Sequence, residues 1–205
     1  MITDEMLVRL RLAVSERLSK RRFEHTLGVE RSARLLAEHC LPERKNEISA
    51  AALLHDITKE FSYEEHLRIV SEAEIELEED VIGTPAVLHS FTAPAVVKSD
   101  FAEFATEDLL SAIRNHTLGE VSMSVFDKII FLADFIEDGR SYPDSIKTAK
   151  YVKEFMREGD FKNNRAVLDR ACLMEFESTV AHLKASERPI NRRTLLAMNS
   201  ILSAN

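Results

Sequence analysis

Apolar residues recur with helical spacing along the chain, and polar capping residues separate one apolar run from the next. Thr3 precedes a first helix that should end near residue 18, a second helix spans about 20–40, and a third ends near Asp56. The later helices are expected to begin at these residues: Ser62 with Glu65, Thr84-Pro85, Thr106, Ser124, Pro143, Asp160 and Asn191. No run of the sequence alternates as a strand would. The pattern therefore predicts an all-α fold.

Proline, glycine and acidic residues indicate where these helices bend or end. Pro94 lies inside the helix that begins at Thr84-Pro85, so we expect a kink or a break there. The strongly acidic segment 72–80 is expected to form a solvated helix end and a loop. Three glycines should end helices: Gly119, Gly139 and Gly159.

Composition and charge narrow the classes of function. A length of 205 residues fits one domain, 1–205, with a sizeable core. The formal net charge of −8 argues against a nucleic-acid-binding protein, although a metal and a few basic side chains can still attract a small anion. Cys40 and Cys172 lie in apolar helical settings, which predicts reduced thiols in a cytoplasmic protein. The N-terminus lacks an apolar leader and the run 129–136 is too short to cross a bilayer, so no membrane partner is expected.

The dipeptide His55-Asp56 is the first candidate site. It follows the apolar run 48–54, where burying an imidazole or a carboxylate costs on the order of several kcal/mol unless the group is paired or bound to a cation. Adjacent helical side chains point about 100° apart, so both can reach one ion only where the helix ends. The helical pattern does fade at Thr58-Lys59. The alternative is a histidine that interacts with the helix dipole beside a capped aspartate.

Asp134 and His25 are further candidate site residues. Asp134 interrupts the segment 125–138, which is apolar on nearly all sides and should therefore be buried. A buried carboxylate needs a cation or several donors, and an ion pair with a core arginine or lysine is the alternative. His25 lies on the half-apolar face of its helix, and Arg22 precedes it by three residues and points the same way. For His25 the alternative is an ordinary core or boundary histidine.

Two further histidines, His89 and His116, lie near helix ends among small or polar residues. Each, taken alone, is typical of a surface histidine, as are His39, His66 and His182. Together with the residues above, however, they form a set of imidazoles and carboxylates that suits Fe, Mn, Zn or Co better than Ca²⁺ or an iron–sulfur cluster. Such a set leaves coordination positions for water, as a catalytic site requires.

The order of these residues resembles a known family. Four stretches carry the resemblance: Arg22-Phe23-Glu24-His25-Thr26-Leu27-Gly28-Val29, His55-Asp56-Ile57-Thr58-Lys59, Arg114-Asn115-His116-Thr117-Leu118-Gly119 and Ala133-Asp134-Phe135-Ile136-Glu137. They resemble the HD-domain superfamily of metal-dependent phosphohydrolases. Together with His89, they are similar to its YqeK-type subfamily, the symmetrical diadenosine tetraphosphate hydrolases. The resemblance covers roughly residues 5–185.

The resemblance implies a fold, a cofactor and a reaction. The fold is an HD-type helical bundle in a single domain, with a core at about 5–185 and C-terminal helices 160–205 packed on it. The reaction splits diadenosine tetraphosphate into two ADP molecules. Some family members dimerise, so a homodimer is left open. A single iron, with Mn, Co or Zn as alternatives, is held by His25, His55, Asp56 and Asp134. The nucleotide lies near Arg22, Lys59, His89, His116 and Arg140.

The implied mechanism assigns catalytic roles to three residues. Asp56 both binds the metal and orients the attacking water, whereas His89 and His116 neutralise phosphate oxygens or protonate the leaving phosphate. The chain departs from the family pattern at three places: Glu120 follows the glycine where a basic residue is common, Asp138-Gly139 replaces a proline-containing turn, and Ser90-Phe91-Thr92-Ala93 follows His89. These departures concern the substrate contacts and leave the metal-binding pattern intact.

Other functions remain open from the sequence. The same positions would serve a phosphohydrolase that acts on nucleoside monophosphates or on a guanosine alarmone. A non-catalytic HD module that senses a nucleotide is a different class, although such modules usually lose metal ligands, and here every motif position is filled. An all-α bundle with unrelated histidines would leave Asp134 unexplained.

Overall fold

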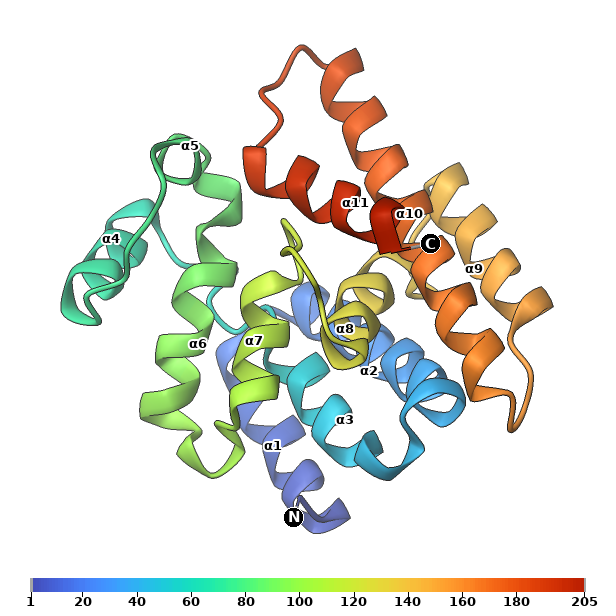
Figure 1. Cartoon of the computed structure of the whole chain (residues 1–205). Helices are drawn as coiled ribbons and strands as arrows, with labels where there is room; N and C mark the ends of the chain where they lie inside the picture. The colour runs from blue at the N-terminus through green and yellow to red at the C-terminus, as the bar shows by residue number, and fades with distance from the viewer. Residues whose placement is uncertain (1, 205) are drawn as a thin grey trace.

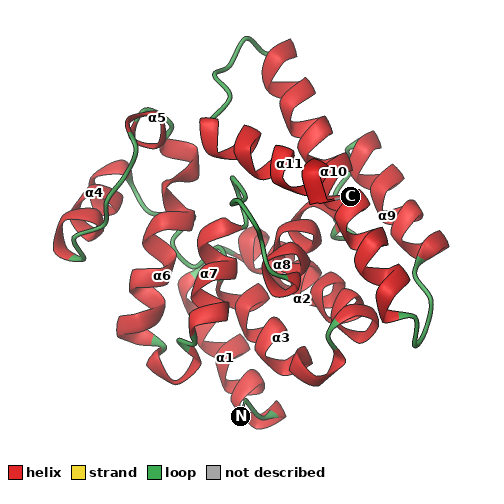
Figure 2. Ribbon diagram, in the orientation of Figure 1, coloured by secondary structure: helices red, strands yellow, loops and turns green. Residues whose placement is uncertain are grey.

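The structure is a computed structural model that describes residues 2–204, and every regular element in that range is helical (Figures 1 and 2). The expected all-α fold is thus confirmed. The α-helices are α1 (Asp4–Arg17), α2 (Lys20–Cys40), α3 (Lys45–Leu54), α4 (Tyr63–Glu72), α5 (Glu79–Ile82), α6 (Leu88–Asp100), α7 (Glu107–Asn115), α8 (Val125–Ile136), α9 (Pro143–Phe155), α10 (Phe161–Ala185) and α11 (Arg192–Ala204). The short 3₁₀ turns are η1 (Pro42–Arg44), η2 (Pro85–Val87) and η3 (Ala102–Phe104).

Helix α8 is largely buried and lies at the centre of the bundle. It packs against α2, α3, α7 and α10, and its apolar residues from Ile129 to Ala133 are fully or almost fully buried. This is the environment expected for a helix that is apolar on nearly all sides. Helices α9 and α10 pack on one another and on α8, while α4 packs on α6 at the opposite side of the molecule (Figure 1). The residues that follow or interrupt these packed helices are therefore brought to the middle of the bundle.

Side-chain caps explain where most helices begin. Ser62 with Glu65 and Ser124 with Asp127 form complete capping boxes, in which each side chain bonds to the other residue's backbone N–H. Further caps come from oxygen atoms that accept a backbone N–H near the helix start: Thr3, Ser19, Thr106 and Asp160. The helix starts predicted at Thr3, Ser62, Thr106, Ser124 and Asp160 are confirmed, whereas the cap at Ser19 was not predicted.

The expectations about helix ends and loops had different outcomes. Pro94 lies inside α6 without breaking it, because the first half of α6 is buried against α7 and α4 and outweighs the loss of one backbone hydrogen bond. The acidic segment 72–80 comprises the end of α4, a loop and the first two residues of α5, and its acidic side chains are exposed, as expected. Helices α8 and α9 end at Ile136 and Phe155, before the glycines expected to stop them.

Gly119 closes the turn that follows α7, and its neighbours explain why no other residue fits. Its N–H bonds to the carbonyl of Asn115, and its φ of +72° lies in the left-handed region that favours glycine. A Cβ atom at this position would lie 2.6 Å from Phe176 Cζ and 2.9 Å from the Cβ of Ala197. The turn after α7 is therefore pressed against α10 and α11.

Gly119→Ala is expected to lower the free energy of unfolding by about 2–5 kcal/mol, because backbone strain adds to overpacking. Gly159→Ala is a matched control, since Gly159 has a similar φ of +75° but nothing within 4 Å of the added Cβ. The control should lose only the strain, about 1–2 kcal/mol. Urea denaturation of both variants measures the difference. Equal losses would show that Phe176 and Ala197 move aside without cost.

Among residues 2–204, no helix is both long enough and apolar enough to cross a membrane.

Candidate metal centre

The turn that follows α3 brings Asp56 to the middle of the bundle. Helix α3 ends at Leu54, His55 is its C-cap, and Asp56 lies in the turn that follows. The Oδ2 atom of Asp56 lies 3.5 Å from His55 Nε2 and 3.7 Å from His25 Nε2. It also accepts a hydrogen bond of 2.8 Å from Nη1 of Arg22. One oxygen of Asp56 thus faces two imidazoles and a guanidinium.

The other oxygen of Asp56 faces a second pair of histidines. Oδ1 lies 3.3 Å from His89 Nε2 and 3.7 Å from His116 Nε2, and these two nitrogens are 3.1 Å apart. Both rings are almost fully buried, as is Asp56. His89 comes from the first turn of α6 and His116 from the C-cap of α7. The expectation that either is a surface histidine when taken alone was wrong.

Asp134 completes the group from α8. Its Oδ1 lies 3.1 Å from His25 Nε2 and is ion-paired with Arg140, whose Nε also donates to the Asp134 carbonyl at 2.9 Å. An arginine pair was the alternative reading of this aspartate, and the structure contains both that pair and the contact with His25. The four predicted metal ligands therefore converge from α2, the turn after α3, and α8.

Hydrogen bonds at Nδ1 fix the ring orientation of His55 and of His116. Nδ1 of His55 donates to the carbonyl of Ala52 at 2.7 Å, and Nδ1 of His116 donates to the carbonyl of Ile113 at 2.6 Å. Each ring then presents the lone pair of Nε2 to the centre. Nε2 of His55 is buried and has no hydrogen-bond partner within residues 2–204. A buried acceptor in that state fits a bound cation.

The donor atoms lie close enough together to hold such a cation. Two groups have ligand atoms within 4.8 Å of one another: His25, His55 and Asp134, and His55, Asp56 and His116. Imidazole nitrogens and carboxylate oxygens are ligands for divalent transition metals. The residues present thus fit the metal that the sequence motifs imply.

Burial and charge set the protonation of the centre. Burial alone would raise the pKa of Asp56, but the neighbouring imidazoles and Lys59 hold that pKa well below its usual range. Burial lowers the pKa of His55 to about 4. Burial opposes protonation of His25, but its hydrogen bond with Asp134 raises the net pKa, so a cation bound there would displace a proton. At neutral pH the centre therefore offers an ionised Asp56 and a neutral His55.

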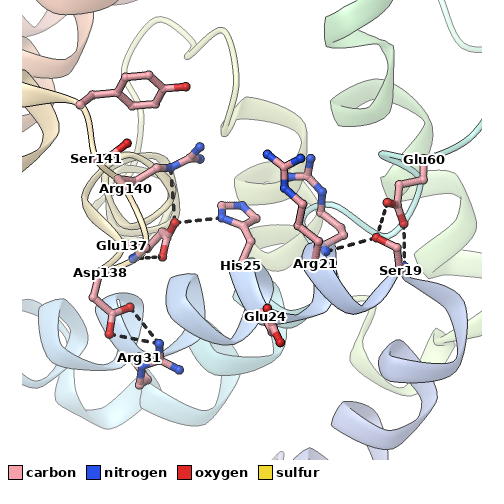
Figure 3. A pocket seen from close by; sticks show the side chains of 13 residues that line it. Ser19, Arg21, Glu24, His25, Arg31, Glu60, Glu137, Asp138, Arg140 and Ser141 are labelled. Atoms are coloured by element: carbon pink, nitrogen blue, oxygen red, sulfur yellow. Dashed lines mark hydrogen bonds and ion pairs between the residues drawn. The ribbon is translucent and has the colours of Figure 1, made fainter.

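A cavity of about 710 Å³ opens beside this centre (Figure 3). His25 lies at its wall, and Arg21, Arg22 and Arg140 supply positive charge around it. Arg31 also lines the cavity but is ion-paired with Asp138 at 2.8 Å. Arg22 and Arg140 are paired with Asp56 and Asp134, but each guanidinium has further N–H donors with which it can bind an anion such as a phosphate.

The structure divides the five predicted nucleotide contacts into two groups. Arg22 and Arg140 line the cavity. His89, His116 and Lys59 lie on the other side of Asp56 and do not line it, and Nζ of Lys59 is 3.0 Å from His89 Nε2. Burial lowers the pKa of Lys59 and of His89. The five residues therefore flank Asp56 rather than form one surface.

The sequence motifs contained two contacts that were given no role. Glu137 Oε1 lies 3.3 Å from Nδ1 of His25, and Thr117 Oγ1 lies 3.1 Å from Nε2 of His89. A signal was present for Glu137, because it lies three residues after Asp134 near the end of the same helix. For Thr117 the only signal was its position next to His116.

His66 was expected to be an ordinary surface histidine and is buried instead. Its Nδ1 lies 2.9 Å from Oγ1 of Thr92, which in turn lies 3.0 Å from Oγ1 of Thr58. The packing of α4 on α6 covers the ring. The departure in residues 90–93 thus supplies Thr92, which ties the turn after Asp56 to α6.

The other two departures from the family pattern also have partners within the fold. Glu120 is ion-paired with Arg193 of α11, whose Nε also donates to the Gly119 carbonyl at 3.2 Å. The N–H of Gly139 donates to Glu137 Oε2 at 2.6 Å. Glu120 is therefore part of a contact between the loop after His116 and the last helix, and not a residue of the cavity.

Comparison with known proteins agrees with this geometry. The sequence model of the HD domain matches residues 22–138. The symmetrical bis(5'-nucleosyl)-tetraphosphatase of Halalkalibacterium halodurans is 30% identical over 92% of this chain and 93% of its own length. The enzyme of the same name from Bacillus subtilis is 28% identical over 94% and 95%. The crystal structure of a predicted HD superfamily hydrolase involved in NAD metabolism from Clostridium acetobutylicum superposes with a TM-score of 0.84 at 26% identity and covers 100% of both chains.

Proposed function

This chain belongs to the HD-domain family, and on that premise we propose that it hydrolyses diadenosine tetraphosphate symmetrically to two ADP molecules. Relatives of that name align with the chain over nearly its whole length. The observation that carries the proposal is the position of Asp56. Both oxygens of its carboxylate face histidines. The centre lies beside a cavity lined by Arg22 and Arg140.

A divalent metal is part of the proposal. His25, His55, Asp56 and Asp134 would hold a single ion, which we propose to be iron, with Mn, Co or Zn as alternatives. When bound, such an ion lowers the pKa of coordinated water and attracts a phosphoryl oxygen. His116 belongs to the second group of donor atoms, so metal content per chain is a necessary measurement. A value of one supports the four-residue assignment, and a value of two adds His116 to the ligands.

The two groups of residues that flank Asp56 are proposed to act on different parts of the substrate. Arg22 and Arg140 face the cavity and would bind phosphate oxygens, which offsets the charge of a polyphosphate in an acidic protein. His89 and His116 lie on the other side, near Lys59, and would hold the proton that the leaving phosphate takes up. Asp56 would orient the water that attacks.

The chemistry balances with one water per substrate. The water oxygen forms a bond to one of the two central phosphorus atoms, and the bond from that phosphorus to the central bridging oxygen breaks. The bridging oxygen leaves with the second ADP and receives a proton, while the proton lost by the water passes to a base of the centre. Attack at either central phosphorus gives the same two products.

Product analysis tests the proposal directly. The purified protein, incubated with diadenosine tetraphosphate and its metal, should release two ADP per substrate, and a chelator should stop the reaction. Release of AMP and ATP would contradict symmetrical cleavage. A parallel panel of nucleoside monophosphates and guanosine alarmones, assayed for free phosphate or pyrophosphate, separates the related phosphohydrolase activities. Binding of these nucleotides without turnover of any would favour the sensing module.

The remaining expectations are proposals of the same kind. We propose a domain that comprises residues 1–205, with a core at about 5–185 and helices 160–205 packed on it. A cytoplasmic location, the lack of nucleic-acid and membrane partners, and a homodimer are also carried forward as proposals.

A further inference from the structure

We propose that Glu137 positions His25 for metal binding, and that residue 28 is a glycine because the Glu137 carboxylate occupies the space of its side chain. This inference rests on the metal centre of the proposed function. Glu137 does not face the metal-binding atoms, and it acts through the far side of the His25 ring. It is therefore a positioning residue.

The contacts of Glu137 hold its carboxylate in one place. Its side chain is only 6% exposed, and Oε1 lies 3.3 Å from His25 Nδ1 (Figure 3). The N–H of Gly139 donates to Oε2 at 2.6 Å, and Nε of Arg140 lies 3.6 Å from Oε1. A carboxylate fixed from two sides can in turn fix the imidazole that donates to it.

The position of His25 in its helix explains why it needs this partner. His55 and His116 follow the last turns of α3 and α7, where backbone carbonyls lack helical partners, and each ring donates to the carbonyl three residues earlier. His25 lies inside α2, where the carbonyls are already used by helical hydrogen bonds. An acceptor from another element must replace them, and Glu137 is that acceptor.

With Nδ1–H donated to Glu137, Nε2 is the ring nitrogen that faces the centre. That atom lies 3.1 Å from Oδ1 of Asp134, and a cation bound between the two atoms would displace the proton of this hydrogen bond. Glu137 thus selects the tautomer in which His25 and Asp134 act together as ligands.

Gly28 gives independent support, because it lies one helical turn after His25. A Cβ atom there would overlap Glu137 Oε2 and would lie 3.3 Å from Glu137 Cδ. A glycine inside a helix costs about 1 kcal/mol relative to alanine. The helix accepts this cost at a position where a methyl group would push Glu137 away from His25.

Metal affinity tests the proposal without use of enzyme activity. The metal-free protein is titrated with Co²⁺ in competition with a chelator. Glu137→Ala and Gly28→Ala should each weaken Co²⁺ binding about 10–100-fold. Glu137→Gln keeps an acceptor oxygen for Nδ1–H and should retain more affinity than Glu137→Ala. Thermal unfolding of the metal-free variants checks that each still folds. If Glu137→Ala does not fold, the Co²⁺ affinity of Glu137→Gln is compared with that of the natural protein instead.

The double variant distinguishes positioning from general damage. If Gly28→Ala acts by displacing Glu137, then Gly28→Ala with Glu137→Ala should bind Co²⁺ no more weakly than Glu137→Ala alone. Additive losses would contradict the link between the two residues. Glu47→Gln and Glu47→Ala are matched controls, since Glu47 is a half-buried carboxylate paired with Arg44 in the first turn of α3. Gly83→Ala is the glycine control, because its nearest neighbour would lie 3.5 Å away.

Two outcomes are decisive and separable. Co²⁺ binding of wild-type strength in Glu137→Ala would overturn the role of Glu137, whatever the natural protein does to diadenosine tetraphosphate. Failure of the natural protein to bind Co²⁺ at all would instead overturn the metal centre, and with it the proposed function.

Discussion

Asp56→Ala is expected to lose both metal and hydrolysis. Asp56 has one oxygen toward His25 and His55 and the other toward His89 and His116, so its removal opens the centre on both sides. Loss of the metal would remove several kcal/mol of transition-state stabilisation. We therefore expect the rate to fall about 10³-fold or more. Metal analysis of the purified variant and its turnover of diadenosine tetraphosphate measure the two effects.

Two companion variants make this result interpretable. Asp56→Asn preserves the shape of the side chain and should also fail to retain metal, because the amide carries no charge. Asp100→Ala removes an exposed aspartate that pairs with Arg17 at 2.6 Å, and it should keep both metal and activity. Full metal content in Asp56→Ala would refute the ligand assignment.

His116→Ala should have the opposite signature, with metal retained and turnover reduced. In the proposed function His116 lies outside the four ligands and holds a proton for the leaving phosphate. Loss of such a general acid or base typically costs about 10²–10⁴-fold in rate. The expected result is therefore an unchanged metal content and a lower kcat.

The alternative outcome for His116 is equally informative. Its Nε2 lies 3.7 Å from Asp56 Oδ1, and it belongs with His55 to the second group of donor atoms. If His116→Ala loses metal in proportion to activity, His116 is a ligand and the proton-holding role falls to His89. His182→Ala, at an exposed histidine of α10, serves as the histidine control.

The fold could be predicted where the determining signals are local. Ser62 with Glu65 and Ser124 defined helix starts because a cap needs only the residues of one turn. The expected break at Pro94 is absent because the local penalty of the proline is outweighed by the packing of α6 on α4 and α7, which a local pattern does not show. The early end of α8 has the same origin, since Glu137 takes an extended backbone conformation and contacts His25 of α2.

The candidate site could be predicted where residue type alone carries the chemistry. His55-Asp56 and Asp134 were recognisable because ionisable side chains interrupt apolar runs, and the structure brings them together with His25. The division of Arg22 and Arg140 from His89 and His116 was not recognisable, because it depends on which side of Asp56 each helix lies. The pattern of residues along the sequence does not show on which side of Asp56 each helix lies.

Partners of structural residues were the hardest to predict. His66 carries no mark in the sequence that distinguishes it from an exposed histidine, yet it bonds to Thr92. From the sequence, Glu120 suggested a change in substrate recognition. In the structure it is ion-paired with Arg193, which lies far along the chain. A departure from a family motif is therefore ambiguous until the residue that compensates for it is known.

The contact between Arg193 and the loop after His116 links the last helix to the centre. Arg193 lies beyond the segment 22–138 that matches the HD domain, yet it binds Glu120 and the Gly119 carbonyl. A substitution at Arg193 can therefore shift the loop after His116 without changing any of the proposed metal-binding residues.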